Sequence, residues 1–187
     1  MAQRYAPRPS MQISVYTVAA LIALAPTFQA AGRVAERESE EAARPEAVFP
    51  IHAEPDWGEA DARFGAFRGG HAHEGQDVFA PAGTPLVAIR DGRVVETGDD
   101  GGRGNYIAIW SPEARHTFVY LHMLRPTPFA EGDAVRMGER VGSVGCTGSC
   151  WGDHLHFEVR DGRGTTGRAR DPLHMLKRLA ARRDARR

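Results

Sequence analysis

From about Val48 onward, short runs rich in β-branched and aromatic residues alternate with turn signals. Such runs, bounded by segments containing Gly, Asn and Asp, are typical of strands. The run at 85–90 is separated from the run at 93–98 by Asp91-Gly92, and Asp-Gly between two β-rich runs predicts a hairpin. Strands this short and frequent predict an all-β domain, built as a compact antiparallel sheet sandwich or a barrel-like sheet. The runs read PLVAIR, RVVETG, NYIAIW, HTFVYLHM, ERVGSVG and HLHFEVR.

The end of the chain holds the one helical candidate after residue 50. Pro172 precedes LHMLKRLAARR, and proline suits the start of a helix because its fixed φ matches the first turn. The last residues, KRLAARRDARR, are strongly basic, and such a run is usually a solvated tail. We therefore expect a short C-terminal helix, a domain over residues 48–175 and an Arg-rich tail over 176–187.

The first residues have the pattern of an export signal. Arg4 and Arg8 precede a mostly apolar stretch from Met11 to Pro26, which is short for a membrane span of roughly 20 apolar residues. We expect residues 1–31 to be a signal peptide, or an N-terminal anchor if they are not removed, and residues 32–47 to be a flexible linker. The domain would then lie in the periplasm, in the cell envelope or outside the cell, with membrane contact only through an uncleaved N-terminal segment.

Charge and cysteines narrow the possible partners. The chain has 24 basic and 24 acidic residues, so its overall charge gives no reason to expect nucleic acid as a partner. Its two cysteines, Cys146 and Cys150, match neither a C-x-x-C redox motif nor a four-ligand zinc site. In an oxidising compartment they can close a small loop by a disulfide, and free thiols in a Gly-rich turn are the alternative.

The run WGDHLHFEVR places two histidines one residue apart. Successive side chains of a strand point to opposite faces, so His154, His156 and Glu158 share one face. That polar face is either a solvated surface or a site. The other face takes the apolar side chains of Leu155, Phe157 and Val159.

Two further segments bring histidines. His73 lies four residues before Asp77, with Gly75 between them, so that the intervening loop can turn both side chains onto one metal ion. Imidazole and carboxylate ligands suit zinc, and a catalytic zinc keeps three protein ligands and one open position. His156 can supply the third ligand from a different strand, which leaves His154 beside the metal.

The third histidine segment is HTFVYLH. Strand alternation there predicts that Phe118, Tyr120 and His122 share one face, so that His122 points into the same groove as the other histidines.

The order of these motifs closely resembles the lysostaphin/LytM-type zinc metallopeptidases, over roughly residues 62–160. The resemblance rests on His73-x-x-x-Asp77, Tyr120-Leu121-His122 and His154-Leu155-His156, and on the framework segments GQDVFAPAGTPLVAIRDGRVV and EGDAVRMGERVGSVG. It implies a compact antiparallel β domain with a groove over one Zn²⁺ ion, and cleavage of peptidoglycan stem peptides or cross-bridges. We expect the protein to be a monomer. It also implies that His73, Asp77 and His156 bind the zinc and that His122 and His154 are catalytic. Zinc lowers the pKa of a bound water toward ~7, and the two histidines would orient that water and stabilise the oxyanion.

Two other functions stay open at this point. One is a non-catalytic module of the same fold that binds peptidoglycan or activates another hydrolase; the other is a secreted peptidase for glycine-rich proteins. Three neighbours of the motifs have no role in the resemblance. We expect Glu74 to be a surface residue and His71 a rim residue, and Trp151 either to stack on substrate or to fill space in its loop.

Overall fold

The computed structural model describes residues 46–185. The expected export segment, nearly all of the linker and the last two residues of the expected tail lie outside the described residues. No helix within residues 46–185 is long and apolar enough to cross a membrane.

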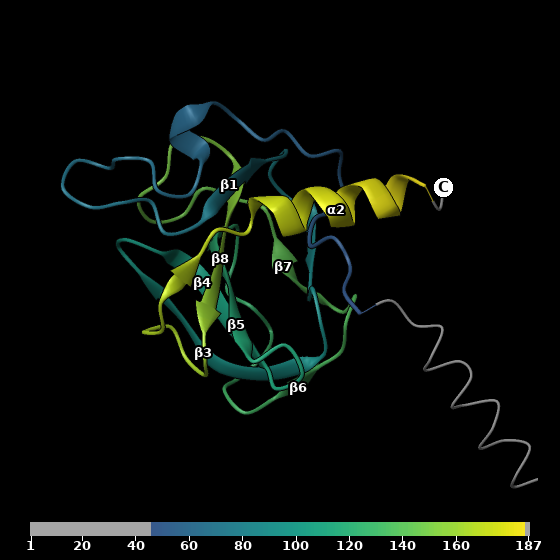
Figure 1. Cartoon of the computed structure of the whole chain (residues 1–187). Coiled ribbons are helices and arrows are strands. Elements are labelled where there is room, and N and C mark those ends of the chain that lie inside the picture. Colours follow the sequence, from purple (N-terminus) through teal and green to yellow (C-terminus); the bar gives the residue numbers. More distant parts are fainter. Residues whose placement is uncertain (1–45, 186–187) are drawn as a thin grey trace, which may run out of the picture. The chain divides into compact units, whose positions relative to one another are not determined.

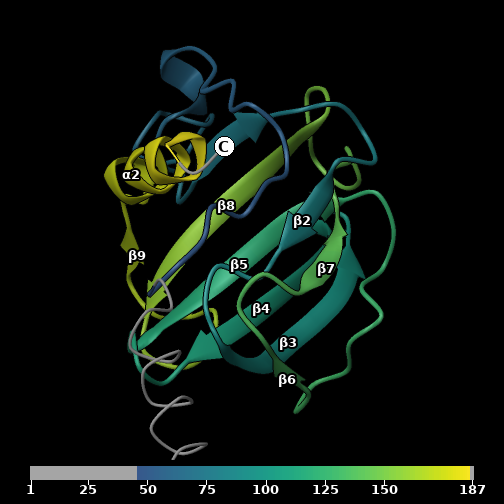
Figure 2. The ribbon, with the colours of Figure 1, turned by 90° about the vertical axis from the view of Figure 1, so that its right-hand side faces the viewer.

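Antiparallel strands form one large sheet, as the pattern of short β runs predicts. Its order is β1-β8-β5-β4-β3-β6, with β9 paired to β8 (Figure 2). Two further strands, β2 and β7, pair with each other in a separate small sheet. The strands are β1 (Gln76–Phe79), β2 (Pro85–Val87), β3 (Gly92–Asp100), β4 (Gly104–Ser111), β5 (His116–Met123), β6 (Ala134–Val135), β7 (Arg140–Ser143), β8 (His154–Asp161) and β9 (Ala169–Arg170).

The main core lies between the small sheet and one face of the large sheet. Leu86 of β2 and Val141 of β7 belong to the same buried cluster as Tyr120 and Phe157 of the large sheet. The opposite face of the large sheet carries a second, smaller buried cluster of Tyr106, Ala108, Val119 and Leu121. Because alternate residues of β4 and β5 enter different clusters, both faces of the central strands are covered. The all-β antiparallel fold is thus confirmed.

The hairpin prediction at Asp91-Gly92 is wrong. The two runs on either side enter different sheets: β2 pairs with β7, whereas β3 pairs with β4 and β6. The reason is that the segment 134–143 pairs with both runs, through β6 with β3 and through β7 with β2. Gly138 N donates to Ala88 O (2.8 Å) and Met137 N donates to Asp91 Oδ1 (2.6 Å), so Asp91 caps a neighbouring turn and does not head a hairpin.

The C-terminal helix is present as α2 (Leu173–Asp184) and lies across the domain beside β8 (Figure 1). Leu176, Leu179 and Ala180 of this helix are buried in the main core. The expected boundary between domain and tail at residue 175 therefore falls inside a helix that packs as part of the domain. The basic residues are compatible with this because Lys177, Arg178 and Arg182 are exposed. Arg183 instead lies against the domain, where its Nη1 donates to Ile51 O and Ala53 O.

Candidate metal centre

Strand pairing brings two of the expected ligands face to face. Strands β1 and β8 are antiparallel neighbours, and Asp77 is the direct partner of His156. Directly opposed side chains lie on the same face of a sheet, so both point to the side away from the main core. His73 lies in the loop before β1, where its backbone exchanges hydrogen bonds with the turn at Gly65 and Ala66 (2.8 Å each).

The side chains of His73, Asp77 and His156 converge at one buried point. His73 Nε2 lies 3.1 Å from Asp77 Oδ1 and 2.9 Å from His156 Nδ1. His156 Nδ1 lies 2.9 Å from Asp77 Oδ1. All three residues are buried, and the three ligand atoms lie within 4.8 Å of one another. Ligands of a tetrahedral zinc at about 2.1 Å from the ion are about 3.4 Å apart, so the set fits zinc with little adjustment.

The outer ring nitrogens show why this point needs a cation. His73 Nδ1 lies 2.8 Å from Arg63 O, and a carbonyl only accepts, so the proton of a neutral ring sits on Nδ1. His156 Nε2 lies 3.0 Å from the carboxylate of Glu158, which places its proton on Nε2 for the same reason. The inward nitrogens of both rings then present lone pairs toward the anionic Asp77. Three lone pairs at this distance require a shared proton or a metal ion.

Arg68 holds the other oxygen of the Asp77 carboxylate. Its Nη2 donates to Asp77 Oδ2 (2.6 Å) and to Asp61 O (2.7 Å). Burial on its own raises the pKa of Asp77, but the close contacts of its carboxylate with His156 and His73 outweigh burial and hold that pKa well below the usual range. Asp77 is therefore a carboxylate at neutral pH, with one oxygen facing the histidines and the other fixed by arginine.

A network of charged side chains contacts the outer nitrogen of His156. Glu158 accepts from Arg160 Nε (2.7 Å), and Arg160 Nη2 also donates to Glu74 Oε2 (2.8 Å). Burial raises the pKa of Glu158, but its contacts with His156 and Arg160 lower it overall, so Glu158 is ionised. An ionised acceptor on the outer nitrogen orients a ligand histidine and raises the basicity of the nitrogen that binds metal.

His122 reaches the site by a route that strand alternation does not predict. Tyr120 is paired with Phe157 and both lie in the main core, whereas Leu121, paired with His156, faces the site. Regular alternation would therefore turn His122 into the core, and the prediction that it shares a face with Tyr120 is wrong.

A bulge in β5 corrects the direction of the His122 side chain. Between the pairs Ile107–Tyr120 and Asn105–Met123, β5 contains one more residue than β4, and His122 has a φ of +60°. Its ring consequently lies 5.0 Å from that of His154 and 5.8 Å from that of His156, measured between ring centroids.

The two histidines that are not among the converging ligands share one hydrogen-bonding arrangement. His122 Nδ1 donates to Thr147 O and His154 Nδ1 donates to Gly152 O, each at 2.8 Å. The Nε2 atom of each neutral ring is then an acceptor. Burial lowers the pKa of His122 to about 4, even though the bond to Thr147 opposes the shift, and burial also lowers the pKa of His154. Both rings are neutral at neutral pH.

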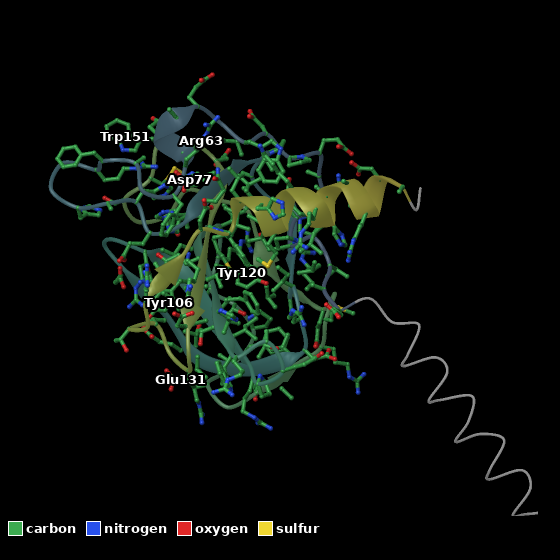
Figure 3. The ribbon with its side chains drawn as sticks, viewed as in Figure 1. Arg63, Asp77, Tyr106, Tyr120, Glu131 and Trp151 are labelled. Atoms are coloured by element: carbon green, nitrogen blue, oxygen red, sulfur yellow. A yellow bond between two sulfur atoms is a disulfide. The ribbon has the colours of Figure 1, made fainter. Side chains whose placement is uncertain are left out.

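A hollow of about 780 Å³ lies over these histidines. Phe67, His71 and Trp151 line it, and all three are exposed, Trp151 to 89%. Trp151 therefore does not fill space in its loop. Figure 3 shows it at the same end of the domain as Arg63 and Asp77. The loop before it is closed by a disulfide between Cys146 and Cys150, with Cα atoms 5.5 Å apart.

All five histidine and aspartate side chains that the motifs single out thus meet at this hollow. Glu74 is exposed, as expected, but it bonds Arg160. Sequence reasoning missed Arg68 and the role of Glu158. Glu158 carried a signal, because it lies on the same strand face as His156; Arg68, in a Gly-rich loop, carried none.

Comparison with known proteins identifies relatives of this chain. Residues 71–172 match the family model described as peptidase family M23. The chain is similar to the glycyl-glycine endopeptidase ALE-1 of Staphylococcus capitis (36% identity over 109 residues, 58% of this chain and 30% of that protein). It is also similar to the peptidoglycan DD-endopeptidase ShyC of Vibrio cholerae (40% identity over 91 residues, 46% of this chain and 20% of that protein). The chain thus spans less than a third of the length of either relative.

Two solved structures share the fold. The catalytic domain of lysostaphin from Staphylococcus simulans superposes with a TM-score of 0.56 at 34% identity, over 62% of this chain and 89% of that one. A zinc-containing peptidase from Vibrio cholerae gives a TM-score of 0.50 at 26% identity, over 70% of this chain and 37% of that one.

Proposed function

Because the chain belongs to peptidase family M23, we propose that it is an exported zinc metalloendopeptidase that cleaves peptide bonds in peptidoglycan stem peptides or cross-bridges. The relatives support the substrate class, since one is a glycyl-glycine endopeptidase and another a peptidoglycan endopeptidase. The single observation that carries the proposal is the buried meeting of His73 Nε2, Asp77 Oδ1 and His156 Nδ1, all within 4.8 Å.

These three atoms would hold one zinc ion per chain. The chemistry that zinc supplies when bound in such a site is Lewis-acid activation of water and of the scissile carbonyl. Arg68 keeps the Asp77 carboxylate turned toward the ion, and Glu158 keeps the proton of His156 on its outer nitrogen. Both residues thereby organise the site through the ligands they contact.

His122 and His154 would handle the proton. Each ring is neutral and presents Nε2 as an acceptor, so either can take a proton from the attacking water. The imidazolium formed in this way can then donate to the oxyanion or to the leaving amine. Their ring centroids are 5.0 Å apart, close enough for both to serve one reacting centre.

The test combines metal analysis with digestion of purified peptidoglycan by the full chain. We expect about one zinc per chain and new peptide termini, both abolished by a chelator and restored by zinc. His156→Ala should lose zinc and activity together, whereas His122→Ala should keep zinc and lose turnover. Normal zinc content in His156→Ala would overturn the ligand assignment. Stoichiometric zinc without cleavage of several peptidoglycan types would instead indicate a binding or hydrolase-activating module of this fold.

A further inference from the structure

The two histidines proposed as catalytic come from different strands, but both are held by one loop. His122 lies in β5 and His154 begins β8, whereas their hydrogen-bond acceptors, Thr147 O and Gly152 O, belong to the segment 145–152. A carbonyl cannot donate, so each bond keeps the ring proton on Nδ1 and leaves Nε2 free to accept. Loss of either bond would allow the other tautomer, whose Nε2–H cannot take a proton from water.

The ligand histidines are held elsewhere. The outer nitrogen of His73 bonds Arg63 O, and that of His156 bonds Glu158. Neither acceptor belongs to the segment 145–152. Proton handling and metal binding therefore depend on separate supports.

The loop itself has little apolar anchorage. Cys146, Gly148 and Ser149 are exposed, as are Trp151 and Gly152, so burial in a core does not fix its shape. A few hydrogen bonds and the Cys146–Cys150 disulfide do so instead.

Those hydrogen bonds attach the loop to the β3–β4 turn and to the end of β5. Thr147 Oγ1 donates to Met123 O (2.8 Å) and accepts from Asn105 N (2.9 Å), and Ser149 N donates to Gly102 O (3.0 Å). Gly104 permits this contact, since its φ is +60° and a Cβ there would collide with Thr147. The loop thus reaches the histidines from a docked position that the cross-link preserves.

Resting on the proposed function, we infer that the disulfide-closed loop 145–152 is the positioning element of the catalytic pair. Through the carbonyls of Thr147 and Gly152 it sets the tautomer and direction of His122 and His154, and it leaves the zinc ligands untouched. Opening the disulfide would therefore reduce turnover without releasing zinc. Such an enzyme would work only where disulfides persist, which ties its activity to oxidising compartments.

The experiment uses the zinc-loaded full chain and the double variant Cys146→Ser/Cys150→Ser. Zinc content, kcat and KM on purified peptidoglycan, and imidazole ¹⁵N NMR of His122 and His154 are measured together. We expect unchanged zinc, a loss in kcat on the order of 10²-fold with KM little changed, and mixed tautomers where the native protein shows only Nδ1–H. Asp153→Asn, which alters an exposed side chain just outside the loop and away from the hollow with the disulfide intact, is the matched control and should behave as the native chain.

Two further conditions keep the test decisive if the double variant folds poorly. Reduction of the native protein by a phosphine that does not displace zinc should reproduce the mixed tautomers, and Thr147→Val should shift them in the same direction with the disulfide intact. Unchanged tautomers and kcat after reduction would overturn the inference. Loss of zinc together with the change in tautomers would overturn the inference as well, because the loop would then be a general structural support. If the native zinc protein cleaves no peptidoglycan but its single tautomers still depend on the disulfide, the proposed function fails and the positioning role stands.

Discussion

The contact between Glu158 and His156 allows a quantitative prediction about zinc affinity. His156 Nε2 donates to Glu158 Oε1 at 3.0 Å, and both residues are buried, at 8% exposure each. The substitution Glu158→Gln keeps an oxygen that can accept this bond but removes its charge. It also keeps the side chain's volume, so that packing around β8 is preserved.

The magnitude follows from the kind of bond that is weakened. A hydrogen bond to a charged group contributes about 1.5–3 kcal/mol, roughly twice a neutral one. Loss of an outer partner of a metal ligand typically costs about 10–100-fold in metal affinity, or about 1.4–2.8 kcal/mol. Because Gln keeps a neutral hydrogen bond, only the difference of about 1–1.5 kcal/mol is lost, so we expect the Kd for zinc to rise by about tenfold, the lower end of the second range. Arg160 keeps Glu74 as a partner, at 2.8 Å, so its charge is not left unpaired in the variant.

The assay is competition for zinc between the protein and a chelating indicator at neutral pH, with folding checked by near-UV circular dichroism. Glu96→Gln is the matched control. Glu96 is a half-buried carboxylate that, like Glu158, bonds an arginine, Arg103 (2.7 Å), and none of its hydrogen bonds reaches a zinc-ligand candidate. Its variant should bind zinc as the native chain does. An unchanged Kd for Glu158→Gln, with native circular dichroism, would refute the supporting role of this carboxylate.

Three further predictions concern other parts of the site. Arg68→Gln removes the partner of Asp77 Oδ2 and should weaken zinc binding by about tenfold in the same assay. Arg63→Gln leaves the backbone carbonyl of Arg63 in place and should bind zinc as the native chain does. Equal zinc affinities of the two variants would show that Arg68 does not support the metal site. His122 has a folded pKa of about 4 against 6.5 unfolded, so its neutral form contributes stability that is complete above pH 6.5 and is lost as pH falls toward 4. In chelator, the free energy of unfolding of the native chain should therefore fall by about 3 kcal/mol more than that of His122→Gln across this window, and parallel pH profiles from urea titrations would contradict the burial argument. Trp151→Ala should raise KM for peptidoglycan by about two- to tenfold with kcat nearly constant, since Trp151 is 89% exposed at the rim; an unchanged KM would exclude stacking on substrate.

Several elements could be predicted from the sequence because they depend on local pattern. The β runs recur between turn residues, and all six contain or overlap an observed strand. In β8, strict alternation places Leu155 and Phe157 in the core and His154 and His156 on the other face. The pairing of Asp77 with His156 was not visible in the sequence, but the family resemblance carried by the motifs implied that both belong to one site.

Other features depended on how distant segments meet. The segment 134–143 draws β2 and β3 into different sheets, so Asp91-Gly92 makes no hairpin although its local signal for one is strong. Contacts with the main core bury Leu176 and Leu179 and make a basic chain end part of the domain. Neither outcome follows from local propensity, because each depends on which part of the domain the segment packs against.

His122 shows the same division within a single residue. The sequence by itself determined that a histidine lies near the end of the β5 run and, by family resemblance, that it belongs to a site. Only the tertiary structure decided how it gets there: an extra residue opposite Tyr106 bends β5, and a φ of +60° turns the ring away from the core. Arg68 and the carbonyls of Thr147 and Gly152 also join the site only through the tertiary structure. Their contacts span 2 to 25 positions along the chain, and the backbone carbonyls carry no mark of their role in the sequence. The chemistry of the site was thus encoded in side-chain identity, whereas the direction and protonation of each group were set by neighbours that only folding supplies.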